Sequence, residues 1–183
     1  MIRLLAISGS LRRVSSNTSL VRAAALVAPA GVEILVYEEL GGLPPFNPDD
    51  DDSGATPAAV LAFRALLAAA DGVVISSPEY AHGVAGVLKN ALDWVVGSGE
   101  FSGKPVALFN ASPRASLAQA SLEEIVRTMD ARLVPEASLA LPLLGRKLDA
   151  AAIAADADMA MALRATLKAF ARAVTEKPDE PAG

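Results

Sequence analysis

The chain has 183 residues, a formal net charge of −5 and a hydrophobic content of 52%. This composition argues against a disordered chain, and the acidic charge argues against nucleic acid or an anionic membrane as the main partner, because both attract clustered cations. The sequence contains no cysteine, which excludes disulfides and thiolate chemistry, and its single histidine, His82, cannot form a histidine cluster that binds a metal.

The N-terminal residues indicate neither export nor membrane insertion. The chain begins with a strand-like run and lacks a basic region followed by a small-residue cleavage site. No apolar run approaches the ~20 residues that a membrane-spanning helix needs. We therefore expect a cytoplasmic protein.

Five short apolar segments are predicted to be strands: 2–7, 32–37, 72–76, 105–109 and 133–137. Their nearly continuous apolar character is typical of strands that are covered on both faces. Apolar residues at helical spacing follow in segments 20–28, 61–70, 84–95 and 148–174, the last with Asp149 as a possible cap. The alternation predicts an α/β fold with a parallel sheet between helices. We expect one domain over residues 1–175 and a frayed tail over residues 176–183.

Segment 38–57 interrupts this alternation. It contains two glycines in sequence, three prolines before residue 49 and four consecutive aspartates from Asp49 to Asp52, which together predict a long irregular connection. Such a loop is often functional or an oligomer contact. We interpret the aspartates as a solvated acidic surface, because without spaced acceptors they do not resemble a calcium-binding loop.

A hydroxyl-rich loop follows the first predicted strand and precedes a helix. Ser10, Ser15, the Arg12 guanidinium and the free amides of the helix start near Asn17 are donors suited to a phosphate. The helix dipole adds partial positive charge at the same place. The alternative is that Asn17 and Ser15 only cap the helix and that Arg12 is an ordinary exposed arginine. Phosphate binding is the favoured interpretation.

A second loop follows the third predicted strand. Pro78 fixes a turn, Tyr80 offers a planar face, and Gly83 allows a ring to approach the backbone, which suits a slot for a flat heterocycle. The alternative is a simple turn before a helix, with His82 exposed and Tyr80 anchoring the loop. In an open parallel sheet the carboxyl ends of neighbouring strands share one edge, so both loops are expected to border one crevice.

These two loops carry a resemblance to a known family. Residues 9–12 with Ser15 and Asn17, residues 78–80, the run Leu88-Lys89-Asn90-Ala91-Leu92-Asp93-Trp94 and the stretch 43–49 are similar to the NADPH-dependent FMN reductase family. The resemblance implies a flavodoxin-like three-layer sandwich with a five-stranded parallel sheet of order 2-1-3-4-5. It also implies a bound FMN, NADPH or NADH as co-substrate, and a homodimer or homotetramer.

The resemblance also implies roles for single residues. Ser10, Arg12, Ser15 and Asn17 hold the FMN phosphate, and the isoalloxazine ring is bordered by Pro78, Glu79, Tyr80, His82 and Gly83. The run 89–94 is mainly structural. No catalytic side chain and no metal ligand is implied, and the roles of Ser112 and Arg114 stay open. Many relatives have asparagine at the position of Ala81.

The expected activity is transfer of reducing equivalents from a nicotinamide cofactor through FMN to a small molecule. The acceptor classes are a quinone, an azo compound, free flavin and a metal oxyanion. Two other classes stay open: a flavodoxin-like electron carrier without nicotinamide-dependent turnover, and a redox-silent interaction module that kept the fold.

Overall fold

A central parallel sheet organises the computed structural model, which describes residues 1–52 and 54–176. The strands run in the order β2-β1-β3-β6-β7, and β8 pairs with the end of β6. Every pairing in this sheet is parallel. Their bounds are β1 Ile2–Ser8, β2 Val32–Tyr37, β3 Gly72–Ser76, β6 Pro105–Asn110, β7 Arg132–Leu133 and β8 Leu139–Ala140. The predicted α/β fold and strand order are confirmed.

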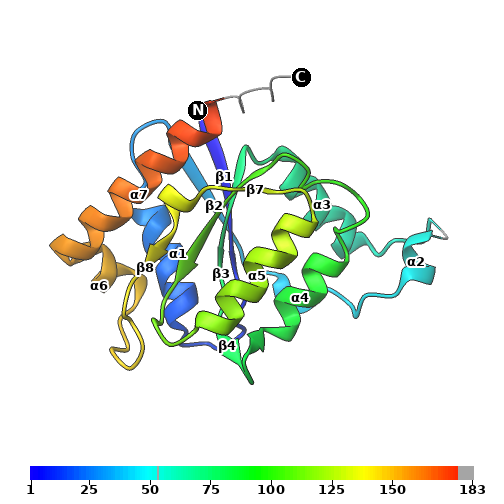
Figure 1. Ribbon diagram of the computed structural model, residues 1–183, viewed down its shortest axis with the longest axis horizontal. Coiled ribbons are helices and arrows are strands. Elements are labelled where there is room, and N and C mark those ends of the chain that lie inside the picture. Colours follow the sequence, from blue (N-terminus) through cyan, green and yellow to red (C-terminus); the bar gives the residue numbers. More distant parts are fainter. Residues whose placement is uncertain (53, 177–183) are drawn as a thin grey trace.

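Helices cover both faces of the sheet (Figure 1). One face packs against α3 (Ala58–Ala69), α4 (Gly86–Asp93) and α5 (Ser116–Thr128), and the other against α1 (Ser16–Leu26), α6 (Ala150–Ala155) and α7 (Ala157–Thr175). Side chains alternate along β1 accordingly: Leu5 and Ile7 lie in the first core, Leu4 and Ala6 in the second. This double burial explains why the strands read as continuous apolar runs.

The C-terminal elements differ from the prediction in two places. The strand predicted over 133–137 is wrong in extent, because Pro135–Ala137 form a 3-10 turn (η2) between β7 and β8. Pro135 has no N–H to continue the ladder. The single closing helix is wrong as well, since the chain breaks at Asp156, which ends α6 and caps α7 by accepting a 3.0 Å bond from Met159 N. The predicted cap Asp149 is confirmed, at 2.8 Å from Ala152 N.

Segment 38–57 contains two short helices, η1 (Leu40–Gly42) and α2 (Pro48–Asp52). The interpretation of its aspartates as solvated is wrong for Asp51. Arg64 of α3 donates to both carboxylate oxygens of Asp51, at 2.9 and 2.7 Å, and also to the carbonyl of Trp94. The pKa of Asp51 is lowered, chiefly by the hydrogen bonds from Arg64. Arg64 therefore connects the acidic segment to α3 and, through the Trp94 carbonyl, to the end of α4.

The run 89–94 has the structural role that the resemblance implied, because it holds the loop of residues 44–46 against α4. Pro44 O accepts hydrogen bonds from Asn90 Nδ2 at 2.9 Å and from Trp94 Nε1 at 2.8 Å. Phe46 N donates to Asn90 Oδ1 at 2.8 Å, and the rings of Phe46 and Trp94 meet edge to face at 5.0 Å. These contacts give the N–H of the fully buried Trp94 indole a hydrogen-bond acceptor, and they fix the loop of residues 44–46 in place. In the described part of the chain, no helix is both long and apolar enough to cross a membrane.

Candidate functional site

The first loop joins β1 to α1 and buries its serines. Ser8, Ser10 and Ser15 are each less than a tenth exposed. Ser15 caps α1 by accepting from Thr18 N at 3.3 Å, and Ser10 Oγ accepts from Arg12 N at 3.4 Å. Residues 9–19 include no carboxylate, so the field at this helix start favours an anion.

Asn17 is not a cap, which corrects that part of the capping alternative. It lies inside the first turn of α1, and its Oδ1 accepts a 2.8 Å hydrogen bond from the fully buried Ser76 Oγ at the end of β3. The Gly9 amide donates to Ser76 O at 2.8 Å as well. A Cβ on Gly9 would lie 3.1 Å from Ser77 Oγ. The ends of β1 and β3 are thus fastened together, as the strand order predicted.

The second loop folds into a small hairpin that the sequence did not reveal. Strands β4 (Glu79–Tyr80) and β5 (Gly83–Val84) are antiparallel, and Ala81 and His82 form the turn with φ angles of 49° and 62°. This left-handed pair is typical of a tight hairpin turn. Tyr80 is 52% exposed at the end of β4. Ala81 and His82 are exposed as well, so the turn of the hairpin is accessible to solvent.

Glu79 does not face solvent. Its Oε2 accepts from the backbone amide of Ala118 at 2.9 Å, and its Oε1 lies 3.3 Å from His82 Nδ1. The pKa of Glu79 is lowered, above all by the backbone hydrogen bond from Ala118. The side chain is therefore engaged with the start of α5, and only its backbone is available for a ligand beside the hairpin.

A third loop, after β6, reaches the same edge of the sheet. Asn110 shapes it by accepting from Ser112 N at 2.8 Å and donating to Ala115 O at 3.2 Å. Ser112 Oγ accepts from Arg114 N at 3.3 Å, so the hydroxyl has a local role. In the part of the chain that the structure describes, Arg114 forms no ion pair.

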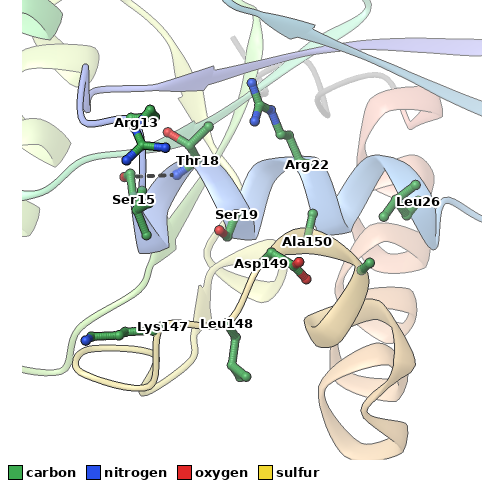
Figure 2. Close-up of a pocket in the computed structure, with 12 residues that line it drawn as sticks. Arg13, Ser15, Thr18, Ser19, Arg22, Leu26, Lys147, Leu148, Asp149 and Ala150 are labelled. Atoms are coloured by element: carbon green, nitrogen blue, oxygen red, sulfur yellow. Dashed lines mark hydrogen bonds between the residues drawn. The ribbon is translucent and has the colours of Figure 1, made fainter.

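A pocket of about 360 Å³ adjoins the first loop on its α6 side. Figure 2 shows Arg13 and Ser15 at the start of α1, with Lys147 and Leu148 across from them. The pocket includes Ser15 but not Ser10, Arg12 or Asn17, so it neighbours the predicted phosphate site without coinciding with it. Sequence reasoning missed Lys147, because nothing in its local pattern indicates that residue 147 returns to α1.

Comparison with known proteins assigns this arrangement to a family. The model of the NADPH-dependent FMN reductase family matches residues 2–144, from β1 through all three loops at the edge of the sheet. The chain belongs to the NADPH-dependent FMN reductase family. The resemblance seen in its motifs is confirmed.

Relatives within the NADPH-dependent FMN reductase family support the same assignment. The chain is 42% identical over 113 residues to an NAD(P)H-dependent FMN reductase of Pseudomonas aeruginosa, an alignment that covers 61% of this chain and 60% of that protein. It is 36% identical over 135 residues to a 2-hydroxy-1,4-benzoquinone reductase of a Burkholderia species, covering 70% and 72%. The chain thus spans less than two thirds of the length of the first relative.

Solved structures agree over nearly the whole chain. The flavoenzyme NAD(P)H:(acceptor) oxidoreductase FerB of Paracoccus denitrificans matches with a TM-score of 0.77 and 28% identity, covering 95% of this chain and 97% of that one. An oxidoreductase of Corynebacterium diphtheriae matches with a TM-score of 0.65 and 21% identity, covering 97% and 98%. The second likeness concerns the fold alone.

Proposed function

We propose that the protein is an NAD(P)H-dependent, FMN-containing oxidoreductase that passes reducing equivalents from a nicotinamide cofactor to a small-molecule acceptor. The observation that carries this proposal is the fastening of the first loop to the end of β3 through Gly9, Asn17 and Ser76. These hydrogen bonds bring the start of α1, which we propose to bind an anion, close to the end of the strand that leads into the exposed hairpin turn. This combination suits a ligand with a phosphate at one end and a flat ring at the other.

The residues of the first loop fit an FMN phosphate. In our proposal the Ser10 and Ser15 hydroxyls, the Asn17 side chain and the Arg12 guanidinium hold it, with the start of α1 supplying free amides. Arg12 is exposed and, within the described residues, forms no ion pair that would compete. Because residues 9–19 contain no carboxylate, nothing in the loop repels a dianion.

The hairpin borders the isoalloxazine ring in the same proposal. Pro78, Tyr80, His82 and Gly83 flank the ring, and Glu79 contributes through its backbone because its carboxylate is engaged elsewhere. When bound, FMN supplies the hydride acceptor and the electron donor, so the chain needs no catalytic side chain of its own. The residues of the chain would orient the ring and donate backbone hydrogen bonds to it.

We further propose a quinone as the acceptor, with azo compounds, free flavin and metal oxyanions as wider candidates. The support is the name of the Burkholderia relative, a benzoquinone reductase. The exposed ring of Tyr80 suits contact with a flat acceptor. The family resemblance further favours a homodimer or homotetramer in the cytoplasm.

The test is a spectrum of the purified protein followed by anaerobic mixing with NADPH and, separately, NADH. We expect a yellow protein, or one that binds one FMN per chain on addition, and rapid bleaching of the flavin band. A flavin band that neither nicotinamide bleaches would instead indicate an electron carrier. A chain that retains and binds no FMN would indicate a redox-silent module.

A further inference from the structure

The hairpin of residues 79–84 is too small to hold its own shape. Each of its strands has two residues, and it pairs with no strand of the main sheet. Two-stranded ribbons of this kind are marginally stable in water. Its turn also places Ala81 and His82 in the left-handed region, which side chains other than glycine adopt at a cost. Contacts outside the hairpin must therefore keep it in place.

The start of α5 lies next to the hairpin (Figure 1). This helix has no side-chain cap of its own. Its N-cap position is Ala115, whose side chain accepts no hydrogen bond, and its first turn contains no acidic residue. The first amides of a helix need an acceptor from outside the helix. Here the acceptor is Glu79, which lies 39 residues before Ala118 in the chain.

The Glu79 carboxylate therefore makes two contacts that no other side chain duplicates within residues 1–52 and 54–176. One oxygen completes the start of α5, where the helix dipole favours a negative charge. The other lies beside His82, in the strained turn. The Glu79 side chain is 15% exposed, whereas that of His82 is 79% exposed. Glu79 is therefore the residue that anchors the hairpin to α5.

We infer that Glu79 is a positioning residue, which fastens the hairpin to α5 and so presents the backbone of residues 78–83 to the flavin ring. That the hairpin is presented to a flavin rests on the proposed function. The fastening itself is independent of any ligand. It gives the carboxylate of Glu79 a role in this loop that does not require contact with the ligand.

The experiment compares Glu79→Ala and Glu79→Gln with Asp156→Ala as the matched control. Asp156 also caps a helix, α7, with a side-chain oxygen, but α7 lies on the other face of the sheet. We measure hydrogen exchange of the amides of residues 79–84 in FMN-free protein, the Kd for FMN, and the midpoint potential of the bound flavin. The melting temperature of each variant reports on the loss of overall stability.

We expect Glu79→Ala to speed exchange of the hairpin amides and to weaken FMN binding, each by about tenfold, the lower end of the range for a hydrogen bond to a charged group. The flavin potential should shift as well. Glu79→Gln should restore most of the protection, because its amide oxygen still accepts from Ala118. Asp156→Ala should lower the melting temperature while leaving hairpin exchange, the Kd and the potential unchanged.

The inference is overturned if Glu79→Ala resembles Asp156→Ala in hairpin exchange and in FMN binding. If the wild-type protein binds no FMN, the proposed function fails, and hairpin exchange alone still decides whether Glu79 fastens the loop. Should Glu79→Ala not fold, Glu79→Asp takes its place, because the shorter side chain cannot reach Ala118 and His82 together. Unchanged hairpin exchange in Glu79→Asp would then overturn the inference.

Discussion

Arg12 lies in the loop before α1, whereas Arg22 lies in the second turn of that helix, and their charged groups have different surroundings. Arg22 donates to Glu38 Oε1 at 3.1 and 2.6 Å, so its charge is already partnered. Arg12 stands in the loop and, over the residues that the structure describes, has no carboxylate partner. Of these two arginines, Arg12 is therefore the one whose guanidinium is available to a phosphate.

Replacing Arg12 with alanine should therefore weaken FMN binding. We expect a loss of about 1.5–3 kcal/mol, the usual worth of a hydrogen bond to a charged group, or roughly 10- to 150-fold in Kd. Fluorescence titration of apoprotein with FMN measures this. Arg22→Ala is the control and should change the Kd little. Undiminished FMN affinity in Arg12→Ala would show that this arginine is not part of the phosphate site.

At the scale of elements, the hairpin turn carries measurable strain. Ala81 has a φ of 49°, where a Cβ clashes with the backbone and glycine does not. Ala81→Gly should stabilise the apoprotein by about 1 kcal/mol, raising Tm by about 2–4 °C. The control Ala65→Gly, at an exposed site in α3, should destabilise the protein by about 1 kcal/mol and lower its Tm. A lower Tm for Ala81→Gly would mean that the turn is not left-handed in solution.

The link between α2 and α3 predicts a pH dependence. The pKa of Asp51 is lowered from its ordinary value of 3.8 by Arg64, so the ion pair stabilises the fold above that value and the stabilisation is lost as pH falls through the lowered pKa. In Asp51→Asn, residue 51 has no carboxylate to protonate, so this pH-dependent loss of stability is absent. Denaturant unfolding between pH 6 and 3 should show the wild-type protein losing more stability than Asp51→Asn below about pH 4. Parallel losses would contradict the linkage.

The elements that the sequence predicted well are those whose pattern is local. Buried strands such as Gly72–Ser76 are apolar throughout, and alternation with helices limits the sheet to few topologies. The Glu79 contact with α5 and the Asp51–Arg64 pair were not predictable, because each joins residues that are distant in the chain. The break at Asp156 was missed because the apolar stripe continues through it.

For the candidate site, strand order was sufficient to bring the two loops together. It could not show that Asn17 bonds Ser76, that Glu79 is turned toward α5, or that Lys147 returns to the first loop. These details depend on side-chain rotamers and on the long connection after β8. Family resemblance names the residues near a ligand, and the structure distinguishes which of them already have protein partners.

At the scale of the whole molecule, the proposed oligomer is directly measurable. Sedimentation equilibrium should give the mass of two or four chains at micromolar concentration. A groove between α4 and α5 with the half-exposed Val96 on its rim provides one apolar face for such contact. A single-chain mass would contradict the proposal and would leave the FMN site to one chain.

The most direct measurement is a crystal structure of the protein grown with excess FMN. The account predicts the phosphate on the loop of Ser10, Arg12 and Ser15, and the isoalloxazine beside the backbone of residues 78–83, with Glu79 still bonded to α5. FMN bound elsewhere, or no FMN bound at the edge where β1 and β3 end, would contradict it.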